Sequence, residues 1–376
     1  MLMTSKPLHS HVWICWASGL DAHVMGSFTA TWQLRAARRE RGEDHGVMTD
    51  SEDNAEERGP GQRPGAAAAA PGVAETEARR ALDAYPTLVT VGVVFTCMEQ
   101  AGRRWRIIAT GQNTPQQARD ELAHHFLEAV SNADEAAREE FRAAAEVLDR
   151  ERHDELTVAD RRFRIGRIEK IARVGSDGPE PPRSCDPETP PDNGQARAHR
   201  SLGFLDAIAM SGTAAAVTRY ELHTKVPETS TTAEHHYACR ALDTHSRLVL
   251  LPAQFTPAEE IDGHWRPHTP GTQASPQAAR DSLADYFRTI VPGPDSPDPV
   301  LARAARALGH HSPGPAVCAE YATAADTLDR EHGNDIHVAG RHFRITRIEH
   351  IVRLSMDGPE PPRPCDHDPY PPPASH

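Results

Sequence analysis

The segment Arg161-Arg-Phe-Arg-Ile-Gly-Arg-Ile-Glu-Lys-Ile-Ala-Arg173 occurs a second time, 180 residues later, as Arg341-His-Phe-Arg-Ile-Thr-Arg-Ile-Glu-His-Ile-Val-Arg353. The similarity extends to both sides, and 26 of the 43 positions from 144 to 186 are identical to their partners. Self-similarity of this extent indicates a tandem duplication of one folding unit. The β-branched residues favour a strand, and the turn at Ala159-Asp160 before it favours a hairpin with a bulge near Gly166.

The similarity continues upstream at an offset of about 160, where Ala81-Leu-Asp83 corresponds to Ala241-Leu-Asp243 and Trp105-Arg106 to Trp265-Arg266. Copy two carries about 19 extra residues between Phe287 and Tyr321. We therefore place copy one at 78–191 and copy two at 238–376, which includes a Pro-rich tail. Residues 192–237 are the expected linker, with a short helix over 202–217 that ends near Ser211-Gly212.

The pattern within each copy predicts the order α-β-β-α-α-β-β. In copy one the pattern predicts helices over 74–84, after Thr114 and over 134–152. It predicts strands over 88–96, 105–109, 156–158 and 163–174. In copy two it predicts a helix over 232–244 and a strand over 248–255. Thr114-Pro115 and Ser275-Pro276 are typical helix starts, and Gln117 is expected to complete a capping box in copy one. Pro267 confines the second strand of copy two to a sheet edge. The predicted fold class is α+β: two homologous domains, each a small antiparallel sheet with two or three helices, form an internal pseudo-dimer.

Residues 1–77 are expected to be a disordered N-terminal tail, because an acidic run at 50–57 and five consecutive alanines bury too little apolar surface to fold. We also expect Met48 to be the true start and residues 1–47 to be a mis-assigned extension. The net charge of -13 works against coating DNA or anionic lipid. Six cysteines without a Cys-x-x-Cys pair, and no long apolar run, predict a cytoplasmic protein without membrane association.

Eight charged residues recur at matching positions of the repeated segment and are the candidate binding residues: Arg164, Arg167, Glu169, Arg173, Arg344, Arg347, Glu349 and Arg353. Guanidinium groups match phosphate oxygens, so an arginine-rich strand is suited to hold phosphate or nucleic acid. The alternative is a solvated sheet face whose arginines pair with carboxylates of a neighbouring helix.

Three further features have a functional and a structural interpretation. The segment Asp177-Gly-Pro-Glu-Pro-Pro-Arg183, repeated at 357–363, is either a polyproline ligand for a partner or an arm lying across its own domain or the sister copy. Cys365-Asp-His-Asp368 resembles a set of metal ligands, but copy one lacks the histidine, so we expect an exposed thiol and no metal site. Trp105 and Trp265 are expected in the core rather than as stacking platforms.

Taken together, these residues resemble an uncharacterised actinobacterial family that carries a domain of unknown function, often as two tandem copies. The resemblance rests on residues 164–183 and their partner in copy two, on Ala241-Leu-Asp-Thr-His245 with Leu248-Val-Leu-Leu-Pro252, and on Ser275-Pro-Gln-Ala-Ala-Arg280. It covers most of residues 78–371 and implies no established activity.

The leading hypothesis is a non-enzymatic cytosolic binding or regulatory module that recognises a protein or another macromolecule, because the chain is duplicated and contains no local catalytic motif. One alternative is phosphate or nucleic-acid binding through the arginine-rich strand. A second alternative is an enzyme with a cleft between the copies. The sequence predicts no catalytic residue, no cofactor and no metal, and it favours a protein partner over nucleic acid.

Overall fold

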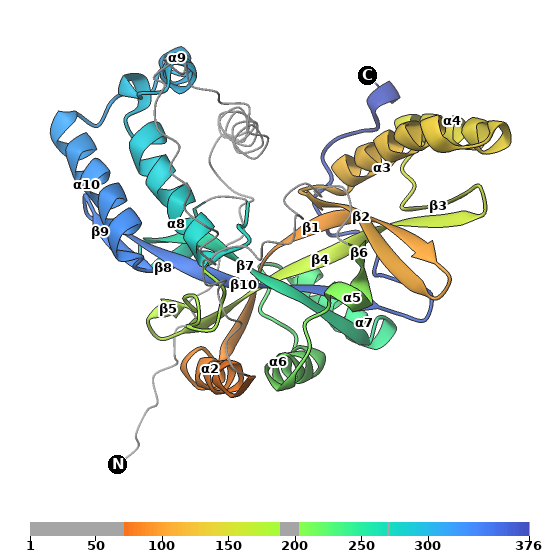
Figure 1. The fold of residues 1–376 in the computed structure, drawn as a ribbon, viewed down its shortest axis with the longest axis horizontal. Coiled ribbons are helices and arrows are strands. Elements are labelled where there is room, and N and C mark those ends of the chain that lie inside the picture. The colour runs from red at the N-terminus through yellow and green to blue at the C-terminus, as the bar shows by residue number, and fades with distance from the viewer. Residues whose placement is uncertain (1–70, 189–202, 269–270, 376) are drawn as a thin grey trace, which may run out of the picture.

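The computed structural model describes residues 71–188, 203–268 and 271–375, which form a mixed α+β structure. The predicted start at Met48 and residues 1–70 of the predicted N-terminal tail lie outside these residues. The last part of that tail, residues 71–77, is not disordered as predicted, because it forms the first half of helix α2 (Pro71–Ala84). In the described part of the chain, nine α-helices surround one curled antiparallel sheet (Figure 1).

The first half of the described chain, residues 71–188, follows the expected order of helices and strands. Its elements are α2 (Pro71–Ala84), β1 (Thr87–Ala101), β2 (Arg104–Gln112), α3 (Pro115–Ala129), the 3-10 turn η1 (Val130–Asn132), α4 (Glu135–Arg150), β3 (Glu155–Val158), β4 (Arg161–Gly175) and β5 (Gly178–Pro179). The side chain of Thr114 caps α3, as predicted. The predicted capping box is wrong in detail, because Gln117 Oε1 accepts from the amide of Asn113 and not from that of Thr114.

The second half, residues 232–375, repeats this order. Its elements are α7 (Thr232–Thr244), β7 (Arg247–Ile261), β8 (His264–Pro267), α8 (Pro276–Asp285), the π-helical turn η3 (Tyr286–Ile290), the 3-10 turn η4 (Gly293–Asp295), α9 (Pro299–Ala307), α10 (Pro315–Glu331), β9 (Asp335–Val338), β10 (Arg341–Leu354) and the 3-10 turn η5 (Pro373–Ser375). The extra residues of this half form the end of η3, η4 and α9. Strand β8 lies at the end of the sheet, as Pro267 predicts.

Three short elements connect the halves: β6 (Gly203–Phe204), α5 (Leu205–Ile208) and α6 (Thr213–Thr224). The expected single helix over 202–217 is therefore wrong in its bounds. Gly212 has a φ of +91°, a conformation that favours glycine, and it precedes α6 rather than ending a helix.

The strands of both halves form one sheet in the order β6-β2-β1-β4-β10-β7-β8, and β3, β5 and β9 pair at the sides of β4 and β10. The helix pair α3 and α4 lies at one end of the molecule, helices α8 to α10 lie at the other, and α2 and α6 lie beneath the centre (Figure 1). Each of these ends has its own hydrophobic cluster. One joins α3 and α4 to the sheet and contains Phe126 and Phe163, and the other joins α8 and α10 to the sheet and contains Phe287 and Phe343. Trp105 and Trp265 are each 7% exposed, which confirms their predicted place in the core.

Strand β4 runs without interruption through Gly166, so the predicted bulge at this residue is wrong. In the pairing of β4 with β1, the register shift lies in β1, between Thr90 and Gly92. Strand β1 also shifts register between Phe95 and Met98, where it pairs with β2. At Gly166 a side chain has no room, since a Cβ there would lie 2.8 Å from Met98 Cε. The spacing of three between isoleucines arises because β4 is buried on both faces, and its residues contribute to separate core clusters.

Strands β4 and β10 meet antiparallel at the centre of the sheet, where Lys170 pairs with His350. On one side of this pair Glu169 is opposite Ile351, and on the other side Ile171 is opposite Glu349. The two residues of the central pair are thus 180 positions apart in the sequence, and the pairs on its two sides repeat each other.

Candidate functional site

The two Pro-rich segments, arm one (177–188) and arm two (357–368), each contact both halves of the molecule. In arm one, the Glu180 amide donates to Arg173 O of its own half at 2.8 Å, and Glu180 O accepts from the Arg347 amide of the other half at 2.9 Å. In arm two, Glu360 makes the corresponding bonds to Arg353 and Arg167, both at 2.9 Å. Each arm therefore crosses from its own half to the other half. The sequence left open whether an arm lies across its own domain or across the sister copy, and each arm contacts both.

All eight predicted binding residues are buried along the line where the halves and arms meet, which we call the seam. Each of these residues is at most 9% exposed. The alternative interpretation is therefore wrong about solvation. It is correct that the arginines pair with carboxylates, and one of these, Glu221, lies on a helix, α6. The role of the eight residues in recognising a partner stays a prediction.

Glu169 is the centre of one charged cluster in the seam. Its carboxylate contacts Arg167 Nη1 at 2.6 Å, Arg363 Nη2 of arm two at 2.8 Å and Arg353 Nε of β10 at 3.2 Å. Burial alone would raise the pKa of Glu169, but the three guanidinium groups lower it to about 2. The side chain is therefore ionised at every pH at which the fold is expected to be stable.

A second cluster surrounds Glu349, which contacts Arg347 closely and Arg183 Nη2 of arm one at 3.8 Å. Arg347 also reaches Asp186 of the same arm at 3.0 Å. Arg173 does not complete this cluster; it pairs with Glu221 of α6 at 2.6 Å. The linker helix α6 thus takes part in the seam.

Arg164 and Arg344 lie farther from the centre, each between an arm and an indole. Arg164 pairs with Glu155 and Asp357, donates to Pro359 O at 3.1 Å, and lies 5.6 Å from the centre of the Trp105 ring. Arg344 pairs with Asp335 at 2.7 Å, donates to Pro179 O at 3.3 Å and lies 5.1 Å from the Trp265 ring. The guanidinium groups are thus used in holding the arms.

A cavity of about 580 Å³ opens beside Arg164, and we call it the seam pocket. Three parts of the chain line it: the segment from α4 into β3, the end of α7, and the start of arm two. Its lining residues include Arg152, His153, Glu155, Arg164, Thr244, His245, Ser355, Asp357, Pro361 and Pro362. Burial lowers the pKa of His245, and the nearby charges of Arg164 and Arg363 lower it as well. The carboxylates of Glu360 and Asp357 act in the opposite direction and raise it, but the net effect is a decrease. A neutral imidazole at this wall can both stack and form hydrogen bonds.

At the matching position in the other half, the end of α2 lies against the strand, and we call this half the closed half. There Ala84 and Tyr85 stand where Thr244 and His245 stand, and Gly175 stands where Ser355 stands. A Cβ on Gly175 would lie 2.2 Å from Ala84 O and 3.0 Å from Tyr85 Cδ1, so the end of α2 presses directly on the strand. Burial and the nearby Asp177 carboxylate raise the pKa of Tyr85, whereas the charge of Arg344 lowers it, and the net effect is an increase.

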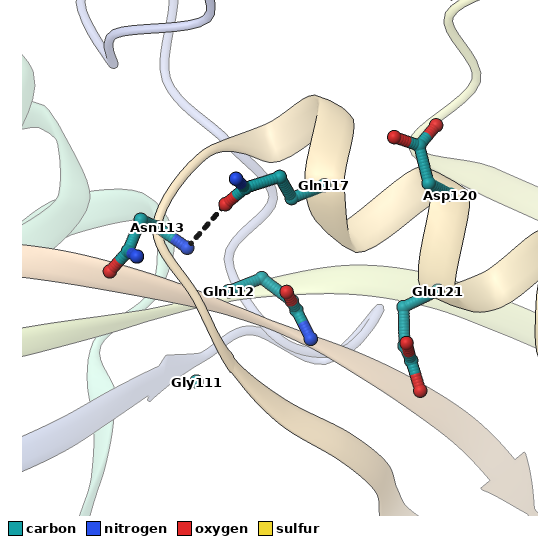
Figure 2. A pocket seen from close by; sticks show the side chains of 6 residues that line it. All are labelled: Gly111, Gln112, Asn113, Gln117, Asp120 and Glu121. Atoms are coloured by element: carbon teal, nitrogen blue, oxygen red, sulfur yellow. Dashed lines mark hydrogen bonds between the residues drawn. The ribbon is translucent and has the colours of Figure 1, made fainter. Parts of the chain in front are cut away.

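A smaller, shallower hollow of about 320 Å³ lies where β2 meets α3 (Figure 2). Its walls carry the amide groups of Gln112, Asn113 and Gln117 and the carboxylates of Asp120 and Glu121. Gln117 is already engaged with the Asn113 amide at 3.1 Å. This hollow is a hydrogen-bonding surface lined by one half only.

At the centre of the sheet, Lys170 and His350 lie opposite each other on one face. His350 is 4% exposed; its burial, and next the charge of Lys170, lower its pKa to about 3. Burial lowers the pKa of Lys170 to about 8. The sequence-based prediction did not include this pair, although the change from lysine to histidine between the copies marks it.

The acidic residues of the Cys365-Asp-His-Asp368 motif are engaged in ion pairs. Asp366 contacts Arg167 at 3.1 Å and Asp368 contacts Arg119 at 2.8 Å. Over the described ranges, no three His, Cys, Asp or Glu side chains are grouped so that they could hold a metal ion. Nor does any helix there have the length and apolar character needed to cross a membrane.

The fold and the seam define a class of mixed α+β protein in which two arms cross-link the halves of one curled sheet. The chain belongs to a family of unknown function, DUF5954, whose model matches residues 68–369. No curated protein and no solved structure matches the chain.

Proposed function

We propose that this protein is a non-enzymatic binding module of the cytoplasm that recognises a protein partner through the seam pocket. The observation that carries this proposal is the pocket itself, because its walls come from both halves and its volume is within the usual range for ligand sites. Its counterpart in the other half is closed by Tyr85 against Gly175. The module therefore offers its partner two unequal surfaces.

We further infer that the two halves are homologous domains that form an internal pseudo-dimer. The central register supports this inference, since Lys170 pairs with the residue 180 positions later, as a twofold axis through that pair requires. The crossed arms support it as well, because Glu180 and Glu360 make corresponding bonds to the opposite half. A binding site at the seam would then depend on both copies.

A protein partner is favoured over phosphate or nucleic acid by the state of the arginines. The arginines of the central strands are paired with carboxylates within the seam. In the described part of the chain, Arg173 Nε and Nη1 and Arg353 Nη1 have no hydrogen-bond partner, but these atoms are buried and a polyanion in solvent does not reach them. The net charge of -13 adds repulsion of polyanions. Salt-dependent binding of a short oligonucleotide, lost in Arg164→Ala with Arg344→Ala, would favour the alternative.

The test is to close the pocket with the residues that close its counterpart. Proteins captured from a lysate of the source organism by the wild-type chain are compared with those captured by His245→Tyr combined with Ser355→Gly. The matched control is Asp120→Asn in the shallow hollow. We expect the double variant to lose a partner that the wild type and the control both retain. Equal capture by all three chains, with unchanged circular dichroism, would rule out the seam pocket as the binding site.

A further inference from the structure

The closed half of the molecule contains a side chain in the position where the open half has its pocket. Tyr85 follows α2 as His245 follows α7, and both residues precede the first strand of their half at the same distance. Tyr85 packs against Gly175, whereas the corresponding Ser355 carries a hydroxyl that accepts from the Asp357 and Gly358 amides. The side chain of His245 is shorter than that of Tyr85, and it lines the cavity instead of filling it.

The surroundings of Tyr85 and of the seam pocket are chemically the same. Asp177, Arg344 and Asp335 act on the hydroxyl of Tyr85 electrostatically. Their counterparts Asp357, Arg164 and Glu155 line the seam pocket. The closed half thus shows which kind of group these walls accommodate: an aromatic ring whose hydroxyl interacts electrostatically with one guanidinium and with three carboxylates, those of Asp177, Asp335 and Glu180.

The open half adds groups that suit a side chain arriving from outside. Asp357 and Glu155 have side chains that are 66% and 37% exposed, so a hydroxyl can reach them from solvent. Pro361 and Pro362 supply an apolar wall, and the ring of His245 supplies a planar one. Tyrosine is well suited to such a site because it brings a large apolar ring and a polar tip at a low entropic penalty.

We propose that the seam pocket binds the phenol side chain of a tyrosine presented by a protein partner, in the manner in which Tyr85 fills the other half. This inference rests on the proposed function and names the chemistry of its partner. The carboxylates accept from the phenol hydroxyl, the Arg164 guanidinium balances their charge, and the ring packs on the prolines and on His245.

The test uses the full chain and N-acetyl-L-tyrosinamide as the probe, followed by saturation-transfer and ring-proton NMR. We expect low-millimolar binding and shifts of the His153 and His245 ring protons. N-acetyl-L-phenylalaninamide should bind at least about fivefold more weakly, since it lacks the hydroxyl that donates to a carboxylate and covers that carboxylate without replacing its bond to water. N-acetyl-L-lysinamide controls for simple attraction to the carboxylates.

The variants separate this inference from the function on which it rests. His245→Tyr with Ser355→Gly should abolish binding of the tyrosine probe, and Asp120→Asn should leave it unchanged. Equal binding of the tyrosine and phenylalanine probes, tighter binding of the lysine probe, or no shift at His245 in the wild type would overturn the assignment of a phenol. If these results occur while the double variant still loses its captured partner, the proposed function stands and only the partner's chemistry is wrong.

Discussion

Replacing Glu169 by glutamine is the sharpest test of the charged seam. The variant keeps the shape of the side chain but removes a carboxylate that lies within 3.2 Å of three guanidinium groups. Breaking a buried ion pair by removing one partner destabilises a protein by roughly 3–5 kcal/mol. The pKa gives a consistent figure, because a decrease from 4.5 to about 2 corresponds to roughly 3 kcal/mol.

The assay is equilibrium unfolding in urea, followed by far-ultraviolet circular dichroism and by tryptophan fluorescence. For a domain of this size, the loss corresponds to a decrease in Tm of about 5–10 °C. Glu146→Gln is the matched control, since Glu146 and Arg150 form an exposed pair at 3.3 Å whose loss is expected to change stability by less than about 0.5 kcal/mol. Glu349→Gln should give an intermediate loss, because only Arg347 is close to that carboxylate and Arg183 is 3.8 Å away.

Two results would refute this reasoning. A loss below about 1 kcal/mol would mean that water screens the arginines around Glu169, contrary to their burial. Separate unfolding transitions for the two probes would mean that the seam does not couple the halves. A double variant gives an independent check: Arg353→Met should restore part of the stability of Glu169→Gln, because Arg353 forms its ion pair with Glu169. Arg363 is less suitable, since it also pairs with Glu360 at 2.6 Å.

Three further results are expected. His350 is neutral in the folded state, because burial and then the charge of Lys170 lower its pKa to about 3. The unfolded chain therefore binds one more proton at this residue, and stability is lost as the pH falls from 6.5 toward 3. Between pH 7 and pH 5 the free energy of unfolding should decrease by about 2 kcal/mol more in the wild type than in His350→Gln, and His124→Gln should behave as the wild type. Gly358→Ala should lower the free energy of unfolding in urea by about 2–4 kcal/mol, because φ is +140° and the new Cβ would lie 2.6 Å from Trp105 Cζ2. The control Gly340→Ala, with a φ of +74° and open space around the new Cβ, should lower it by only about 1 kcal/mol. Similar losses in the two variants would argue against the packing of arm two on Trp105. Iodoacetamide should alkylate the half-buried Cys185, Cys239, Cys318 and Cys365 in the native protein but leave the fully buried Cys97. Burial raises the pKa of Cys185 and Cys365 as well as that of Cys97, so access to the thiol decides the difference, and Cys185 and Cys365 are less exposed than the sequence predicts. Peptide mass spectrometry that found Cys97 labelled at the same rate would contradict its burial.

Local chemistry made most of the secondary structure predictable from the sequence. Thr114 and Ser275 begin helices because each side chain accepts from a free amide of the first turn. The error at Gly166 has a different origin. Periodicity identifies a strand with one buried face, but β4 is buried on both, so its isoleucines carry no period of two.

The crossing of the arms could not be deduced from composition or periodicity. The sequence of arm one fixes a turn and a stiff extended segment, but the direction in which that segment leaves β4 depends on what lies beside β4 in space. That neighbour is β10 of the other half, as the bond from the Arg347 amide to Glu180 O shows. The candidate arginines were identified correctly as a recurring set, yet their burial follows from this crossing.

The sequence analysis considered a cleft between the copies, but the residues of the seam pocket were missed because its walls come from segments far apart in the chain. Thr244 and His245 end one helix, Ser355 follows β10, and Arg152 follows α4. A usable signal was nevertheless present. Tyr85 and Gly175 differ from His245 and Ser355 at matching positions, so both changes that distinguish the open side from the closed side were visible in the repeat.

If the two halves are fused copies of one unit, as we propose, the central pair of the sheet differs in a way that two identical subunits could not. On the inferred twofold axis, position 170 meets its own counterpart, and residues directly opposite on antiparallel strands have Cβ atoms about 5 Å apart on the same face. Two lysines at this place would bring two buried ammonium groups together, and like charges in that arrangement destabilise a sheet. In the proposed fused arrangement the two matched positions can carry different residues, and His350 stays neutral beside Lys170. The same freedom to differ at matched positions allows Tyr85 to close one side of the seam while His245 leaves the other side open.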